Sequence, residues 1–269
     1  YLIAAVAVGL LLVTTIFGHA VGEQQLTLRL GSIAFQPHDP VKLLVVIFMA
    51  AYLAEKRELL DMAHGKFGML TAMDFRYLGP MIALWLLVMA IVFVHQDLGA
   101  AMLLFGVLLC MLYLGTGRWN YLVLGLALFS LGGVAAYHLV DRVQTRVAIW
   151  LNPWADPEGK GYQIVQAIMA LWHGRVVGAG LGGGFPEFIP AIETDMIYAA
   201  ISDDLGLLGA VAIVCLFLVL FGRIFHVALH ADDRFVQLLT AGLGVALAVQ
   251  TFTILAGVIN VGLVFFIVS

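Results

Sequence analysis

Charged residues are scarce in this chain. Asp, Glu, Lys and Arg make up 11% of its 269 residues, whereas a soluble domain usually has roughly 25%. Hydrophobic residues account for 63%. These values exclude an ordinary soluble fold and predict a polytopic helical membrane protein. The formal net charge is only −4, so the chain lacks the basic surface that nucleic acid requires and no nucleic-acid partner is expected.

Cysteine is almost absent. Cys110 and Cys215 each lie inside an apolar run, where a lone cysteine behaves as a small buried hydrophobic residue. Two such residues indicate neither a disulfide framework nor a Cys/His metal site. The sequence also contains no pattern that indicates an organic cofactor.

Long hydrophobic runs are what the chain does have. They fall at about 1–17, 40–54, 79–94, 98–115, 121–139, 196–222 and 236–264. Several are shorter than the roughly 20 residues that a membrane span needs, so flanking semi-polar residues must complete them. The pattern predicts an all-α helical bundle of about seven spans, with residues 1–269 forming a single membrane domain. Because the chain begins inside an apolar run, we expect that the natural protein extends further.

Lys and Arg are distributed unevenly between the predicted loops. The loops 55–78, 116–120 and 223–235 together hold Lys56, Arg57, Lys66, Arg76, Arg118, Arg223 and Arg234, whereas the loop 18–39 holds only Arg29. Short loops rich in Lys and Arg remain in the cytoplasm. The long segment 140–194 is therefore predicted to be external.

Two stretches of this external loop have the pattern of amphipathic helices. Apolar residues fall on one face of Asp141–Leu151 (Val143, Val147, Trp150 and Leu151) and of Tyr162–Trp172 (Ile164, Val165, Ile168 and Trp172). We expect both helices to lie in the lipid headgroup layer with tryptophan as an anchor. The glycine-dense stretch GRVVGAGLGGG follows. Its glycines would either let the backbone approach a ligand or form a flexible joint, and it is not a P-loop because no Lys-Ser/Thr follows.

The most informative stretch is Pro186–Ala210, where a polar, proline-containing segment changes into an apolar helix at Glu193-Thr194-Asp195. Thr or Asp before an apolar run is typical of a helix N-terminus, where the helix dipole favours negative charge. A carboxylate at the boundary of a membrane helix is also a candidate functional group. Asp195 is therefore either a helix cap or a site residue.

Two other polar groups interrupt apolar surroundings, FQPHDPVK at 35–42 and HQDLG at 95–99. In the predicted topology Asp39, Lys42 and Asp97 lie near the same external face as Asp195, which suggests a polar cavity that opens outward. The structural alternative is an Asp39–Lys42 pair at i, i+3 and a helix cap at Asp97. We favour the structural role for Asp97 and ligand binding for Lys42.

The motifs QPHDPVK, HQDLGAA, WLNPWADPEGKGYQIVQA, GAGLGGG, IPAIETDMIYAA and SDDLGLLGA follow one another along the chain. Their order and spacing over about residues 18–262 resemble the SEDS family, the bacterial peptidoglycan polymerases typified by RodA and FtsW. The chain departs from the family pattern where Asp39, Glu193 and the pair Asp203-Asp204 stand in place of Glu, His and Glu-Glu. The family's C-terminal P-L-T-G and S-Y-G-G-S-S signatures are not found. The resemblance therefore predicts a divergent member, truncated at both ends.

The resemblance implies an inverting glycosyltransferase that polymerises lipid II at the outer face of the bacterial cytoplasmic membrane. Asp195 matches the family's essential Asp and is the expected general base. Lys42 is the first choice for the positive charge that neutralises the leaving diphosphate. Further expected substrate-binding residues are Asp39, Glu193, Arg142, Arg146 and Arg175, with Gln36 and Asp97 as structural residues of the cavity. A divalent cation, Mg²⁺ or Mn²⁺, would supply further positive charge to the diphosphate. No residues are assigned as its ligands.

The expected partners are lipid II, a class B penicillin-binding protein and membrane lipids. Two other functional classes remain open: a flippase or transporter of a lipid-linked precursor, and a catalytically silent scaffold for a penicillin-binding protein. The sequence favours the enzyme, because an Asp at the external start of a helix suits chemistry at the outer face.

Overall fold

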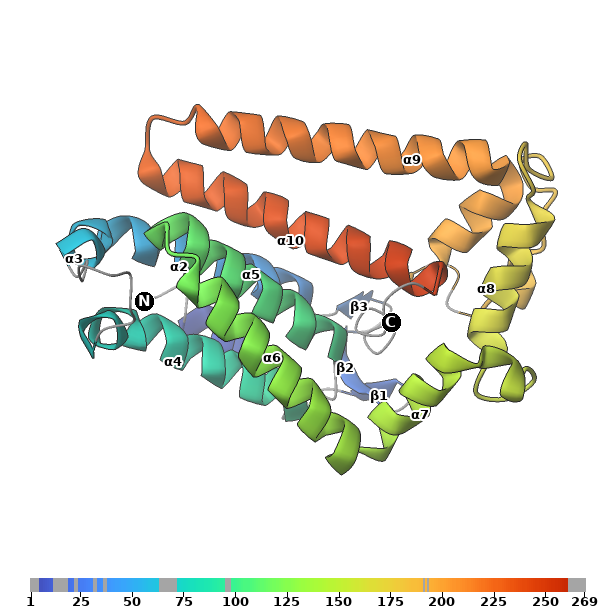
Figure 1. Ribbon diagram of the computed structural model, residues 1–269, viewed down its shortest axis with the longest axis horizontal. Helices are drawn as coiled ribbons and strands as arrows, with labels where there is room; N and C mark the ends of the chain where they lie inside the picture. Colours follow the sequence, from blue (N-terminus) through green and yellow to red (C-terminus); the bar gives the residue numbers. More distant parts are fainter. Residues whose placement is uncertain are drawn as a thin grey trace. The chain divides into compact units, whose positions relative to one another are not determined.

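The computed structural model describes residues 5–11, 19–21, 24–30, 33–35, 38–62, 72–94, 98–190, 192 and 194–260. The chain divides into two compact units, Tyr1–Leu128 with Ile224–Val249 and Phe129–Arg223 with Gln250–Ser269. Figure 1 shows the helices of both units. The expectation of one membrane domain over residues 1–269 stays a prediction.

The first unit is built from long apolar helices. It contains α2 (His38–Glu55), α3 (Arg57–Met62), α4 (Ala72–Val94), α5 (Leu98–Thr116), and parts of α6 (Asn120–Leu139) and α10 (Arg234–Val258). Its buried core includes Val45 and Met49 of α2, Met81 of α4, and Val107 and Met111 of α5. These helices are apolar over most of their surface, as expected for helices that meet protein on one side and lipid on the other.

Small residues and a buried indole set the distances between these helices. A Cβ atom on Gly125 of α6 would overlap the Leu109 side chain of α5, so glycine permits the close approach of the two helices. The Nε1–H of Trp85 donates a 3.0 Å hydrogen bond to the carbonyl of Leu104, which satisfies the only polar group of that buried ring.

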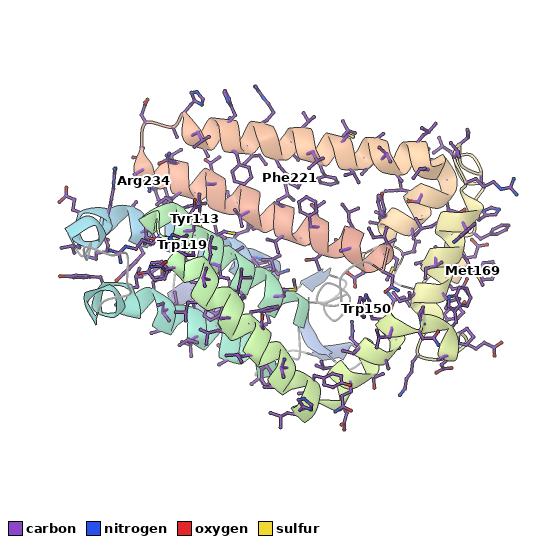
Figure 2. The ribbon with its side chains drawn as sticks, viewed as in Figure 1. Tyr113, Trp119, Trp150, Met169, Phe221 and Arg234 are labelled. Atoms are coloured by element: carbon purple, nitrogen blue, oxygen red, sulfur yellow. The ribbon has the colours of Figure 1, made fainter. Side chains whose placement is uncertain are left out.

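A basic side chain completes one helix end in this unit. Arg234, at the start of α10 (Figure 2), donates a 2.9 Å hydrogen bond from Nη2 to the carbonyl of Leu114 near the end of α5. The last four carbonyls of a helix have no partner within it, and cationic side chains are suited to them. Arg234 therefore joins α10 to the end of α5.

The residues before α2 contain three short strands that the sequence pattern does not predict. β1 (His19–Val21), β2 (Gln24–Leu30) and β3 (Ile33–Phe35) pair antiparallel in the order β1-β2-β3. The pairings Leu28 with Phe35 and Leu30 with Ile33 define the register of the second hairpin. This small sheet is an addition to the predicted helical membrane fold, which is confirmed.

The second unit carries the predicted external loop. It contains α7 (Asp141–Leu151), the 3₁₀ turn η1 (Pro153–Ala155), α8 (Tyr162–His173), the 3₁₀ turn η2 (Pro186–Phe188) and most of α9 (Ile197–Leu229). The two amphipathic helices predicted from the sequence are therefore present at their predicted positions. A buried cluster of Ile164, Ala167, Ala170, Ile189, Met196, Ala199 and Val258 forms the core of this unit.

Five of the described helices are long and apolar enough to cross a membrane. They are Tyr77–Val94, Gly99–Thr116, Asn120–Leu139, Ile197–Leu229 and Arg234–Val258, and they coincide with five of the seven predicted apolar runs. The run 40–54 forms α2, whose 18 residues include Asp39, Lys42 and Glu55. Most of the run 1–17 lies outside the described residues, so seven spans remain a prediction.

Candidate active site

The helix that follows Asp195 is broken at one residue. Gly206 has φ 65° and ψ −169°, a combination that is essentially restricted to glycine. The break divides α9 into a short segment, 197–205, and a long segment, 207–229, and the chain changes direction between them (Figure 1). At 1.5 Å per residue the long segment measures about 35 Å, enough to cross a hydrocarbon core of about 30 Å without the short segment. The sequence predicts one continuous helix here, and the break corrects that prediction.

The glycine loop, residues 174–184, replaces the hydrogen bonds that the break removes. In an unbroken helix the amides after Gly206 would donate to the carbonyls four residues earlier. Four bonds to the loop stand in their place: Leu207 N to Arg175 O (2.9 Å), Leu208 N to Val176 O (3.1 Å), Ala179 N to Asp203 O (3.0 Å) and Gly180 N to Asp204 O (3.0 Å). A buried polar group without a partner costs about 1–3 kcal/mol. The loop therefore removes the main penalty of breaking α9.

Close backbone contact explains two glycines of the loop. A Cβ atom on Gly174 would overlap the carbonyl oxygen of Ser202, and one on Gly178 would overlap that of Asp204. Gly178 also has φ 91°, in the region that favours glycine. For these two glycines the structure shows a third role, beside the ligand approach and the flexible joint considered from the sequence. They let the loop pack directly on the backbone of α9.

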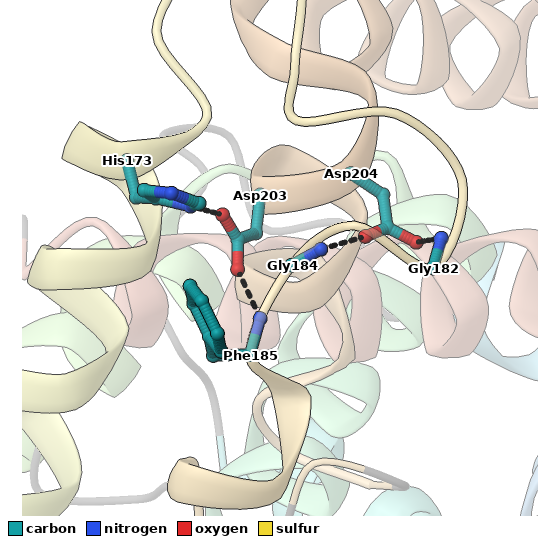
Figure 3. A network of polar contacts seen from close by, with 6 residues as sticks. All are labelled: His173, Gly182, Gly184, Phe185, Asp203 and Asp204. Carbon is teal, nitrogen blue, oxygen red and sulfur yellow. Dashed lines mark hydrogen bonds and ion pairs between the residues drawn. The ribbon is translucent and has the colours of Figure 1, made fainter.

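Two adjacent carboxylates hold the loop from the side of α9 (Figure 3). Asp203 accepts hydrogen bonds from His173 Nδ1 (2.6 Å) and from the amide of Phe185 (3.0 Å). Asp204 accepts from the amides of Gly182 (3.0 Å) and Gly184 (3.1 Å). The side chain of Asp203 is only 3% exposed, and a buried carboxylate is tolerated when its oxygens are paired in this way.

Asp195 lies in the turn directly before α9 and is half-buried. The next residue, Met196, is 1% exposed and packs among apolar residues of α8 and the end of α10. The Met196 carbonyl accepts hydrogen bonds from the amides of Ala199 (2.9 Å) and Ala200 (3.4 Å), so the helical bonds begin there. This anchor fixes the backbone of Asp195 at a helix N-terminus, where the dipole favours the ionised carboxylate.

A family model described as "Cell cycle protein" and named for FtsW, RodA and SpoVE matches residues 1–265. The chain belongs to this family. It is 39% identical over 242 residues to "Peptidoglycan glycosyltransferase RodA" of Mycobacterium tuberculosis, covering 89% of this chain and 52% of the relative. It is 33% identical to "Probable peptidoglycan glycosyltransferase FtsW" of Nitrosococcus halophilus, covering 91% and 62%. The chain thus spans about half the length of the RodA relative.

Solved structures share the FtsW/RodA/SpoVE fold. One is a chain of a peptidoglycan synthase complex, with a TM-score of 0.75 and 22% identity over 97% of this chain and 70% of the other. Another is the rod shape determining protein RodA of Thermus thermophilus, with a TM-score of 0.63 and 18% identity over 100% and 74%. At these identities the likeness concerns the fold, and it agrees with the predicted helical membrane architecture.

The structure places some of the other residues expected from the family resemblance. Lys42 lies in the second turn of α2, half-buried between the buried residues Val41 and Val45. Arg146 is half-buried in α7, and Arg175 is exposed with a left-handed φ of 49°. Lys42 belongs to the first unit and the other two to the second. A shared cavity of Lys42 and Asp195 therefore stays a prediction.

Several expected site residues lie outside what the structure describes. Gln36, Asp97 and Glu193 are not described at all. For Asp39 in α2 and Arg142 in α7 only the backbone is described. Their predicted roles stay predictions. Within the described ranges, no three His, Cys, Asp or Glu side chains come together as a metal site would require.

Sequence patterns do not identify the residues that hold the loop. Asp203-Asp204 stand out only as part of a family motif, and no pattern indicates a role for His173. One signal was available, because two acids inside an apolar helix are costly without hydrogen-bond partners. The partners themselves lie about 20–30 residues earlier in the chain, and no spacing rule relates them to the acids.

Proposed function

We propose that this chain carries the catalytic region of a peptidoglycan glycosyltransferase that polymerises lipid II at the outer face of the bacterial cytoplasmic membrane. Membership of the FtsW/RodA/SpoVE family supports this function, as do the names of the RodA and FtsW relatives. Because the chain spans about half of the RodA relative, the activity, substrate and partners of the whole protein are all part of the proposal.

The chemistry assigned to Asp195 is general-base catalysis. Its carboxylate accepts the proton of the 4-hydroxyl on the acceptor's GlcNAc while that oxygen attacks the anomeric carbon of the donor's MurNAc. The bond from this carbon to the diphosphate breaks, undecaprenyl diphosphate leaves, and the configuration inverts. A half-buried carboxylate at a helix N-terminus suits this role, because the helix dipole favours negative charge there and the side chain remains partly accessible.

The leaving diphosphate requires positive charge. Lys42 is the proposed source, with Arg142, Arg146 and Arg175 as alternatives, and Asp39 and Glu193 complete the proposed substrate-binding set. A divalent cation such as Mg²⁺ or Mn²⁺ would also neutralise the diphosphate. The described residues do not supply a ligand set for it, so no step is assigned to the cation.

The observation that carries the proposal is the position of Asp195, the residue that matches the family's essential Asp, fixed at the start of α9 by the buried Met196.

The test is to supply the purified full-length protein with lipid II and Mg²⁺ or Mn²⁺ and to measure glycan chains by gel electrophoresis. A class B penicillin-binding protein is included as the proposed partner. The structural likeness to a chain of a peptidoglycan synthase complex supports that choice. Binding of lipid II without polymer under all conditions would favour the flippase or the scaffold.

The proposed orientation is testable by cysteine labelling. In a background without Cys110 and Cys215, single cysteines at 152–160 should react with a membrane-impermeant maleimide added outside. Cysteines at 63–68 should react only after the membrane is opened. The reason is the excess of Lys and Arg in the loops proposed to be cytoplasmic. The reverse pattern would place Asp195 at the cytoplasmic face and contradict polymerisation outside.

The depth of the external loop is a second test of location. Trp172, at the end of α8, is 80% exposed in the protein, whereas Trp150 is half-buried. We therefore expect a protein with Trp172 as its single tryptophan to be quenched by lipids brominated near the headgroups. A protein that retains only Trp150 should be quenched less. Equal access of Trp172 to an aqueous quencher with and without lipid would place this part of the loop in water.

A further inference from the structure

The break at Gly206 separates the segment that carries Asp195 from the segment that can cross the membrane. Asp195 precedes the short segment 197–205, and the long segment 207–229 follows the break. A glycine joint has little conformational preference of its own. The angle between the two segments, and with it the direction of Asp195, must therefore be set by contacts elsewhere.

The glycine loop supplies those contacts on both sides of the joint. The carbonyls of Arg175 and Val176 accept bonds from the first amides of the long segment, and the amides of Ala179 and Gly180 donate to the last carbonyls of the short segment. One rigidly paired loop thus bridges both segments. If the loop shifts, at least one of the two segments must shift with it.

The loop is itself held by side chains of the short segment. Both oxygens of Asp203 are occupied, one by His173 at the end of α8 and the other by the amide of Phe185 (Figure 3). The rings of His173 and Phe185 also contact each other, with centroids 5.3 Å apart. Asp203 therefore ties α8 and the end of the loop to the segment that begins beside Asp195.

We propose that Asp203, together with His173, is a positioning residue for the reaction: it fixes the angle at Gly206 and so aligns the Asp195 carboxylate with the acceptor hydroxyl. This inference rests on the proposed function. Asp203 lies eight residues after Asp195, about 12 Å along a helix, and acts through backbone geometry without contact to substrate. A misplacement of about 1 Å at a reacting group can reduce catalysis roughly 10²-fold.

The kinetic test compares Asp203→Ala with Asp203→Asn in the purified full-length protein. Alanine removes both acceptors, and we expect kcat to fall about 10- to 100-fold while KM for lipid II stays within about twofold. Asparagine should restore kcat to within about fivefold of wild type, because its carbonyl still accepts from Phe185 and its amide can donate to the other tautomer of His173. The matched control is Asp232→Asn, an exposed acid between α9 and α10, which should leave both constants unchanged.

We call the contacts of Asp203 with His173 and Phe185 the Asp203 clamp. A distance measurement tests, independently of catalysis, whether this clamp fixes the angle at Gly206. Spin labels at native Cys215 and at Ile197→Cys, both exposed, flank the break in a protein that lacks Cys110. Pulsed electron–electron double resonance should give a narrow distance distribution in the wild type and a broad or shifted one in Asp203→Ala. If Asp203→Ala does not fold, His173→Ala is the variant to measure. The His173 side chain is 47% exposed, so its removal deletes one contact of Asp203 at little cost to the core. It should broaden the distribution and lower kcat about 3- to 10-fold.

The outcomes separate this inference from the proposed function. An unchanged distance distribution in the folded variant overturns the clamp, whatever the activity. A broadened distribution with unchanged kcat overturns the positioning role. Failure of Asp203→Asn to restore kcat also overturns it, because a residue that acts only by position should be rescued by a side chain of the same shape. If the wild type makes no polymer, the proposed function fails and the distance measurement alone judges the clamp.

Discussion

Replacing Asp195 with asparagine should lower glycan polymerisation by roughly 10²–10⁴-fold, the usual contribution of a general base, and should leave the protein folded and able to bind lipid II. The substitution keeps the size of the side chain, and asparagine caps a helix about as well as aspartate. The buried Met196 continues to anchor the turn. An amide nevertheless cannot accept the proton of the attacking hydroxyl.

The measurements are polymer formation from lipid II, binding of lipid II, and thermal unfolding of the purified protein. Glu187→Gln is a suitable control, since Glu187 is an exposed acid in η2 of the same unit. It should polymerise at the wild-type rate. If Asp195→Asn also polymerises like the wild type, Asp195 is not the base. If it loses polymerisation together with thermal stability, the carboxylate of Asp195 has a structural role beyond helix capping, and the loss of activity does not identify it as the base.

Helix periodicity predicts the positions of α7 and α8 in the chain, but it does not predict whether their apolar faces contact lipid or protein. The apolar face of α8 was expected to lie in the headgroup layer, yet Ile164 is buried and packs with Ala167 and Met196 in the core of the second unit. Trp172, assigned to the same face, is 80% exposed. An apolar stripe shows that a face is removed from water, and it does not distinguish lipid from protein.

The position of Asp195 could be predicted from local signals, because Thr and Asp before an apolar run mark a helix start whatever the rest of the chain does. The break at Gly206, eleven residues later, could not be predicted in this way. Gly206 stands in the apolar run LGLLGA at 205–210, where an isolated glycine is tolerated within a helix. Its conformation depends on hydrogen bonds to a loop about 30 residues earlier, and such long-range pairing leaves no periodic signal.

Replacing Gly178 with alanine should lower the free energy of unfolding by about 3–5 kcal/mol. Part of this cost is the left-handed backbone at φ 91°, about 1–2 kcal/mol for a residue with a Cβ atom. The rest arises because the added Cβ would overlap the carbonyl oxygen of Asp204. The loop must then retreat from the break in α9, and each polar group left without a partner adds about 1–3 kcal/mol.

Two other glycines separate these contributions. Gly180 has φ 95° but open space around it, so Gly180→Ala should show only the backbone cost of about 1–2 kcal/mol. Gly132, inside α6, also has open space, and its replacement by alanine should be neutral or stabilise by up to about 1 kcal/mol. Thermal unfolding of the purified proteins in detergent should therefore rank Gly132→Ala highest, Gly180→Ala below the wild type, and Gly178→Ala lowest. Equal losses for Gly178→Ala and Gly180→Ala would show that the loop does not pack directly on the broken helix.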